Sequence, residues 1–537
     1  MPDRMALPAE ILASILLDIY GDGQRQPYLL RASDENERIK SLHACCLVNR
    51  DWRAQSTPVL YSKFQHQGDE NSFAKLWHFL RTIVEKPELG ALVKHLDLRE
   101  RYSWTVERKE EVSPHEQRSR RRERRALLAI GVNLELKRLA EALHSQARAP
   151  FMAILTACLP NVSNLDLSVD YFGHGHNDHY FALPFLEALE ESKALQQLSE
   201  ATLFDSHVTS DEESIRCYPA VFMSGIETLF LRPSIRKLEL FDLNPCCMHA
   251  VSDQLPLGKS NVAHLTITCG GDTRLLSSDN RGLKACLQLP KALVSLTLYM
   301  QSFMSMGGDG RLNHMISHDE LQRILCHHNH TLEYLDLYDN DATCKQHRPE
   351  FNRKAPMGKL NEFDRLTTLR IQPEMLLGGI NGILKAPYRL RDALPPLLHS
   401  LTLYNFYDNK GLINGKDLQT ELFQIITDTI IFDNLNFLII QDTYRNILRN
   451  AAWGEELLDR LNALQQACSD RDIIFRIMSD DHLPQGGCNL LKHPEAHEPE
   501  ERAHNAWKRG LDGLRGDTPE RVRYEFVLPP GVDLVTL

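Results

Sequence analysis

The amino-acid sequence predicts an α/β protein in which short parallel strands form the concave face of a horseshoe and helical or irregular segments form its convex face. The first supporting observation is an apolar motif that returns along the chain, seen most clearly as LEYLDLYDN at residues 332–340. The second is a set of helix-period leucines between the motifs, as at residues 321–330 and 457–468. Repetition of one unit on this scale predicts a solenoid that grows along one dimension.

The motif has the form L-x-x-L-x-L, with Ile or Val sometimes replacing Leu. Further copies end at Leu98, Leu167, Leu240, Ile267, Leu298, Ile371, Leu403 and Ile440, with a weaker copy near Met478. Alternating apolar residues place their side chains on one face of an extended chain, so each copy predicts a strand. The motif resembles that of leucine-rich repeats, although its spacing is longer and less regular than their period of about 20 to 29 residues. An ordinary α/β domain would also alternate strands and helices, but it would not require the repeated L-x-L core.

Composition restricts the class of protein. Hydrophobic residues make up 42% and charged residues 25% of the 537 positions, which is typical of a chain that folds. The formal net charge of −11 argues against a general nucleic-acid binder. No apolar run is long enough to span a bilayer, and charged residues interrupt the first twenty positions, unlike a signal peptide. We therefore expect a cytoplasmic or nuclear protein that binds neither nucleic acid nor membrane.

The amino-terminal region has a different pattern from the repeats. Residues 7–20 read LPAEILASILLDIY and predict an amphipathic helix. A polar stretch follows at about 21–40, and residues 39–64 supply further short apolar helices. A helical unit of about sixty residues is only marginally stable alone and tends to need a partner, although it would also suit a cap on a solenoid.

Two segments of this unit, LPAEILASIL and LHACCLVNRDWRAQSTPVLY, resemble an F-box in the form found in fungal proteins. The match covers about residues 5–65, and the polar insertion at 21–40 departs from the F-box pattern. The resemblance implies a three-helix unit that docks on a Skp-family adaptor. The residues that it assigns to adaptor binding are Leu7, Pro8, Glu10, Ile11, Ile15, Leu16, Leu47, Val48 and Trp52.

The expected organisation follows from these patterns. An F-box at 1–65 precedes a helical linker at 66–91, and an irregular leucine-rich-repeat solenoid occupies 92–480. A charged insertion at about 100–125 interrupts the solenoid after its first repeat, and residues 481–537 form a polar cap or tail.

An F-box joined to leucine-rich repeats is similar to the substrate receptors of SCF-type cullin ubiquitin ligases. The resemblance implies a non-catalytic receptor without a cofactor, which reaches cullin and RING subunits through the adaptor and holds a target protein on its repeats for ubiquitin-dependent degradation. Such a receptor raises the effective concentration of target lysines near a ubiquitin-charged enzyme. A scaffold that acts outside the ligase is an alternative with the same architecture.

Strand alternation indicates which side chains could meet a target. Within each L-x-L the leucines point into the core and their neighbours point to the concave face. Several of these neighbours are aromatic, and aromatic side chains are frequent at protein interfaces, but they also favour strands without any partner. The candidate target-binding residues are Phe241, Tyr299, Tyr334, Asp336, Tyr338, Arg370, Tyr404 and Phe437.

Histidine-rich segments raise the question of a metal. The string HGHNDH at residues 174–179 resembles the metal-binding loop of metallo-β-lactamase-type hydrolases, and its candidate ligands for zinc or iron are His174, His176, Asp178 and His179. A metal-dependent hydrolase is thus the alternative function. The leucine motifs that follow lack the further ligands of that fold, so we expect no bound metal. A second group, His327, His328 and His330, is expected to end an outer helix.

Overall fold

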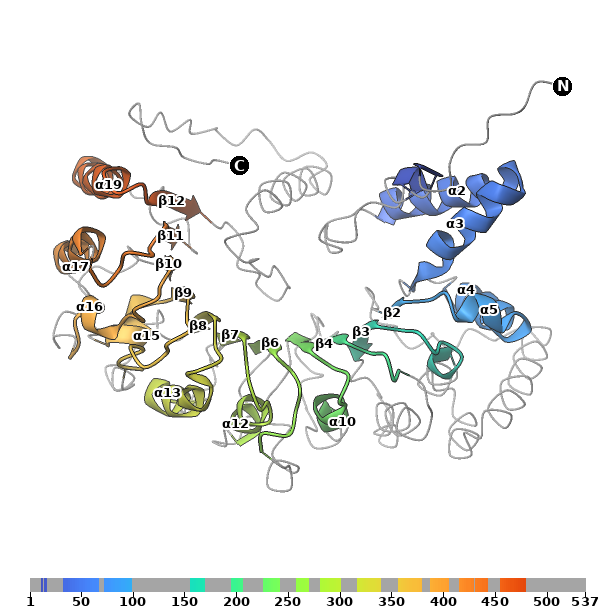
Figure 1. The fold of residues 1–537 in the computed structure, drawn as a ribbon, viewed down its shortest axis with the longest axis horizontal. Coiled ribbons are helices and arrows are strands. Elements are labelled where there is room, and N and C mark those ends of the chain that lie inside the picture. Colours follow the sequence, from blue (N-terminus) through green and yellow to red (C-terminus); the bar gives the residue numbers. More distant parts are fainter. Residues whose placement is uncertain are drawn as a thin grey trace, which may run out of the picture.

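The structure is a computed structural model of the 537-residue chain. The residues that it describes are 11–12, 14–16, 32–66, 72–98, 155–169, 195–205, 226–241, 257–269, 281–300, 316–339, 356–378, 387–404, 415–428, 430–442 and 454–479. They form an α/β fold in which an open, all-parallel sheet follows an arc and the helices after α5 lie on its outer side (Figure 1). The predicted class, an α/β protein with a parallel sheet, is confirmed.

The sheet contains twelve strands in sequence order, each hydrogen-bonded to the next. Their bounds are β1 Lys63–Gln65, β2 His95–Leu98, β3 Asn164–Val169, β4 Glu200–Asp205, β5 Lys237–Phe241, β6 His264–Cys269, β7 Ser295–Met300, β8 Tyr334–Asp339, β9 Thr368–Ile371, β10 Ser400–Tyr404, β11 Phe437–Asp442 and β12 Ile474–Ser479. The predicted motifs coincide with β2, β3 and β5 to β12. Strands β1 and β4 were not predicted, because β1 is very short and β4 has Ala201 where the motif has a leucine.

Most of the described helices connect successive strands. Their bounds are α2 Ala32–Val48, α3 Arg50–Ser62, α4 Ser72–Glu85, α5 Pro87–Gly90, α10 Ile226–Leu231, α12 Arg281–Gln288, α13 His318–Leu325, α15 Pro373–Leu377, α16 Leu390–Ala393, α17 Gly415–Thr427 and α19 Gly454–Ser469, with a 3-10 turn η5 at Cys326–His328. Helices α13 and α19 confirm the outer segments predicted at 321–330 and 457–468.

One continuous core joins the strands to the outer helices. Leu335 and Leu337 of β8 are fully buried in the same cluster as Leu321 and Leu325 of α13. The parallel register places Leu335 beside Leu296 of β7 on one side and beside Leu369 of β9 on the other. Equivalent apolar side chains, most of them leucines, therefore stack from strand to strand, which is why a single strand of this kind would not be stable alone.

Polar side chains hold successive turns together at the edge where the strands begin. The residue three positions before β3, β6 and β8 is Asn161, Asn261 and Thr331, respectively. Each donates a side-chain hydrogen bond to a carbonyl oxygen in the preceding turn: Asn161 to Ala91 at 2.7 Å, Asn261 to Pro233 at 3.0 Å and Thr331 to Leu293 at 2.8 Å. These bonds satisfy main-chain groups that the strand ladder does not reach.

The amino-terminal helices have a small core of their own. Leu12 and Leu16 pack with Leu42 of α2, and Trp52 of α3 lies against this cluster. The side-chain oxygen of Asn49 accepts a hydrogen bond of 2.9 Å from the backbone N–H of Trp52, so Asn49 is the N-cap that separates α2 from α3.

We expect Leu335→Ala to lower the free energy of unfolding by about 2 to 5 kcal/mol, because it leaves a cavity in the shared core. Ile430→Ala is the matched control. Its side chain is 90% exposed, so its loss should stay within about 0.5 kcal/mol. Urea denaturation measures both values, and equal losses would contradict the strand register.

Candidate functional site

The side of the sheet opposite the leucine core carries most of the candidate target-binding residues. Tyr299, Tyr338 and Tyr404 form an apolar cluster separate from the leucine core. The register pairs Tyr299 with Tyr338 across β7 and β8, and it pairs Asp336 with Arg370 across β8 and β9. The predicted alternation of the two faces is therefore confirmed for these strands.

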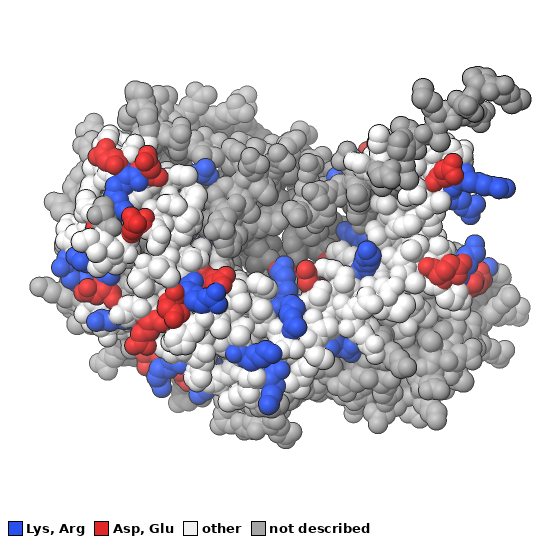
Figure 2. All heavy atoms as spheres, viewed as in Figure 1, with Lys and Arg blue, Asp and Glu red and all other residues white. Residues whose placement is uncertain are grey.

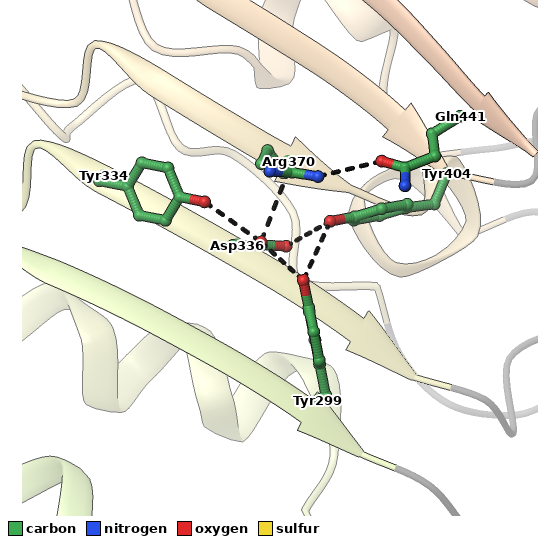
Figure 3. Close-up of polar contacts among 6 residues, drawn as sticks. All are labelled: Tyr299, Tyr334, Asp336, Arg370, Tyr404 and Gln441. Atoms are coloured by element: carbon green, nitrogen blue, oxygen red, sulfur yellow. Dashed lines mark hydrogen bonds and ion pairs between the residues drawn. The ribbon is translucent and has the colours of Figure 1, made fainter. Parts of the chain in front are cut away.

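Asp336 lies at the centre of a polar cluster (Figure 3). Its Oδ2 accepts hydrogen bonds from the hydroxyls of Tyr299 at 2.9 Å and Tyr334 at 3.2 Å, and its Oδ1 accepts one from Tyr404 at 2.7 Å. The carboxylate is fully buried, so these donors replace the water that it would otherwise bind.

Arg370 supplies the opposite charge. Its Nε lies 3.5 Å from Oδ2 of Asp336, and its Nη2 donates a hydrogen bond of 3.0 Å to Oε1 of Gln441. The guanidinium also stands over the Tyr404 ring, 5.6 Å from the centroid. The network therefore runs without a gap from Tyr299 of β7 to Gln441 of β11 (Figure 3). We call the six residues that Figure 3 draws the tyrosine–aspartate cluster.

Tyr338 lies in the middle of the aromatic part of this face. Its ring meets those of Tyr299 and Tyr404 edge to face, with centroid distances of 6.1 and 5.5 Å and interplanar angles of 82° and 81°. Such geometry stabilises aromatic pairs beyond the effect of burial alone. Tyr338 is a packing residue, and truncating it should destabilise the fold much as truncating a core aromatic does.

Burial controls the protonation of the cluster. It raises the pKa of the Tyr299 and Tyr404 phenols well above their usual range, and the Asp336 charge acts in the same direction on Tyr299. Burial also raises the pKa of the Asp336 carboxyl, while Arg370 and the three hydroxyls act against that increase. The tyrosines therefore remain protonated donors at neutral pH, so this arrangement is suited to holding a buried carboxylate and not to proton abstraction.

The expectation that this face is open to a target is wrong for most of the candidate residues. Tyr299 is 6% exposed, Tyr334 6%, Tyr338 2% and Arg370 3%, while Phe241, Asp336 and Tyr404 are fully buried and Phe437 is half-buried. The tyrosines, Asp336 and Arg370 contact one another through hydrogen bonds, an ion pair and edge-to-face ring contacts. Sequence alternation identified the face correctly, but it could not give these contacts between strands.

The first half of the same face is more polar and more accessible. Glu200 and His264 are exposed, and His95 is half-buried with its Nε2 3.0 Å from Oδ2 of Asp166. Lys237 of β5 pairs with Glu239 at 2.9 Å. A partner would therefore meet charged side chains on β2 to β6 more readily than the tyrosines of β7 to β10.

The candidate adaptor-binding residues fall into three groups. Leu47 is 74% and Val48 61% exposed, and Ile11 and Ile15 are also exposed. Leu16 is fully buried in the core of the helical unit, four positions from Leu12, so its assignment to an open docking face is corrected. Trp52 is half-buried against that core, and its assignment to adaptor binding stays a prediction. Leu7, Pro8 and Glu10 lie outside the described residues.

The structure describes only one of the two histidine groups singled out in the sequence. Residues 174–179, with the candidate ligands His174, His176, Asp178 and His179, lie outside the described ranges. Within those ranges, no group of three or more His, Cys, Asp or Glu side chains is arranged to hold a metal ion. His327 and His328 end the outer helix α13 through the turn η5, as predicted.

His328 is a buried histidine whose hydrogen bonds are satisfied. Its Nδ1 accepts from the backbone N–H of Leu293 at 3.4 Å, so its Nε2–H donates to the carbonyl oxygen of Leu287 at 3.0 Å. Burial lowers the pKa of its imidazole, which is held neutral.

Comparisons with protein-family models, with curated proteins and with solved structures find no match for this chain. In the described part of the chain, every helix falls short of the length and hydropathy that crossing a bilayer requires.

We expect Arg370→Met to destabilise the protein by about 3 to 5 kcal/mol, because it leaves the Asp336 carboxylate buried without its cation. Loss of the cation raises the Asp336 pKa further. A carboxyl whose pKa is raised by folding loses stability as the pH rises through the folded pKa, so the variant should be more destabilised at about pH 8 than at about pH 5. Denaturant midpoints relative to the wild type measure this difference.

A second substitution tests whether the two charges are coupled. Asp336→Leu added to Arg370→Met removes both ions and should recover part of the loss. Strict additivity of the two single changes, with no dependence on pH, would show that the charges do not interact.

We expect His328 to make stability depend on pH below the unfolded pKa of 6.5. Its folded pKa is lowered, so its contribution is present above 6.5 and is lost as the pH falls toward the folded pKa. His328→Gln, an uncharged replacement, should therefore lose less stability than the wild type between about pH 7.5 and about pH 5.5. Thermal unfolding at both values measures the effect, and parallel losses in the two proteins would exclude this role.

Proposed function

We propose that this chain is the substrate-recognition subunit of an SCF-type cullin ubiquitin ligase, with an F-box unit that binds a Skp-family adaptor and a leucine-rich-repeat horseshoe that binds a target protein. The observation that carries the proposal is the exposed apolar surface of the amino-terminal helical unit, beside a long curved sheet. In the described part of the unit, the core contains Leu12, Leu16 and Leu42, while Leu47 and Val48 leave adjacent apolar surface in water, and a contiguous apolar patch often marks a binding surface.

The exposed residues support docking because they are distinct from the core of the unit. Leu12, Leu16 and Leu42 already stabilise the packing of the helices, so Ile11, Ile15, Leu47 and Val48 are not needed for that purpose. Leu47 and Val48 end α2, directly before the Asn49 cap of α3. A partner that covers them would remove apolar surface from water and stabilise a unit that is small for independent folding.

The role proposed for the sheet follows from its shape. A stack of parallel strands presents a long surface whose side chains are fixed by the shared core, so a bound target would be held in a defined position relative to the adaptor. Such a receptor contributes proximity and performs no bond chemistry itself. No observation on the described residues favours the hydrolase alternative.

We expect Leu47→Asp with Val48→Asp to abolish co-purification of a Skp-family adaptor and of the cullin that it carries. Each carboxylate would be desolvated against an apolar partner, at a cost of several kcal/mol, while the exposed positions let the unit itself stay folded. Pull-down with purified adaptor measures the effect.

Ile430→Asp with Leu257→Asp is the matched control, because it places the same two charges at exposed apolar sites outside the helical unit. It should leave adaptor binding unchanged. Full adaptor binding by the Leu47 and Val48 double variant would refute the proposed docking surface, whereas Leu16→Asp would be uninformative because that residue is part of the core.

A further inference from the structure

Three exposed cations lie close together at the edge where the middle strands begin. Arg236, Lys259 and Lys291 precede β5, β6 and β7. Figure 2 shows Lys and Arg side chains gathered over the middle of the arc, whereas red and blue side chains are mixed toward the end that carries β9 to β12. We call these three residues the basic edge.

The backbone places the three residues around Asn261. Nη1 of Arg236 donates hydrogen bonds to the carbonyl oxygens of Asn261 at 3.3 Å and Pro233 at 3.4 Å. Ser260 forms a parallel bridge with Pro290, and the N–H of Lys291 donates to the carbonyl oxygen of Ser260 at 3.0 Å. Lys259 and Lys291 therefore stand on neighbouring segments, and the Arg236 guanidinium is held beside them.

No cation of the basic edge has an acidic partner within the described residues, whereas several other cations of the chain do. Lys284 pairs with Glu320 at 3.6 Å, and Arg391 pairs with Asp428 at 2.7 Å. Within the described residues, Lys259 and Lys291 form no ion pair, and the hydrogen bonds of the Arg236 side chain go to neutral carbonyls. This concentration of uncompensated positive charge occurs in a chain whose formal net charge is −11.

The titratable groups near the basic edge include both cations and acids. Burial lowers the pKa of His264 on β6, and the nearby charge of Lys237 acts in the same direction, while Glu200 and Glu333 oppose it. Glu239, the acidic residue on β5, already forms an ion pair with Lys237, with 2.9 Å between Oε1 and Nζ. Oε1 of Glu333, which precedes β8, lies 3.8 Å from Nη2 of Arg365. These two acids therefore pair with other cations, and the basic edge has no bonded counter-charge among the described residues.

We infer that the basic edge binds an acidic peptide segment of the target protein, an inference that rests on the proposed function. Lysine and arginine both attract carboxylates, and an arginine held in place by two carbonyl bonds loses little conformational freedom on binding. A peptide fits better than a nucleic acid, because the three cations would neutralise only about three phosphates, fewer than the roughly six to ten phosphate contacts of a typical DNA-binding surface. The basic edge is also exposed, whereas the tyrosine–aspartate cluster is buried.

The test measures binding of a fluorescein-labelled peptide of ten glutamates to the full chain by fluorescence anisotropy. The test variant carries Arg236→Glu, Lys259→Glu and Lys291→Glu. The control variant carries Lys86→Glu, Arg323→Glu and Lys359→Glu, three exposed cations elsewhere, so both variants change the net charge by the same amount. Circular dichroism checks that each variant is folded, and adaptor pull-down is performed on the same samples.

We expect the test variant to lose at least about tenfold in affinity for the peptide and the control variant to change by less than about twofold, with the wild-type affinity falling as salt is added. Equal losses in the two variants, or unchanged binding by the test variant, would overturn the inference. Tighter binding of a single-stranded oligonucleotide of equal charge would overturn it in favour of a nucleic acid. Adaptor binding without peptide binding would reject the basic edge alone, whereas peptide binding without adaptor binding would reject the ligase role.

Discussion

In-register stacking of the leucines is the constraint on which the rest of the structure depends. A shift of one residue between two strands would turn the leucines of one strand toward the concave side and expose its charged neighbours to the core. The register that keeps Leu335 between Leu296 and Leu369 also brings Asp336 beside Arg370 and Tyr299 beside Tyr338. The concave surface is thus a consequence of the core, because its residues are aligned by contacts on the other side of the sheet.

The concave surface divides into two parts with different physical roles. Over β7 to β11, tyrosine hydroxyls and a guanidinium compensate one buried carboxylate. Such a cluster stabilises the sheet only if every buried polar group in it is hydrogen-bonded, because an unpaired group would cost the fold its desolvation energy. Over β2 to β6, the charges of His95, Lys237 and Glu239 are paired but remain near solvent. The buried part stabilises and specifies the arrangement of the strands, and the accessible part and the adjoining edge are the regions available for recognition.

The sequence predicted most strands because the L-x-L core is local information that each segment carries by itself. It missed β4, where Ala201 interrupts the motif, and it assigned Leu16 to the surface because a helical stripe alone does not show which side faces its neighbours. The tyrosine–aspartate cluster required contacts between segments far apart in the chain. The basic edge consists of residues that precede the strands, outside the L-x-L motif. The sequence pattern therefore gave no reason to group Arg236, Lys259 and Lys291, and only the fold brings them together.

The tyrosine–aspartate cluster has a further consequence for how this array unfolds. In most solenoids each unit contacts only its nearest neighbours, so stability is close to a sum of local terms and the ends can fray one unit at a time. Here the Tyr404 hydroxyl of β10 reaches Asp336 of β8, and Arg370 of β9 reaches Gln441 of β11. Separating one of these strands from the sheet would leave buried polar groups without hydrogen-bond partners on strands that are not adjacent to it. Strands β7 to β11 should therefore unfold as one cooperative block, whereas the described side-chain hydrogen bonds on β2 to β6 join neighbouring strands, so these strands can separate one at a time.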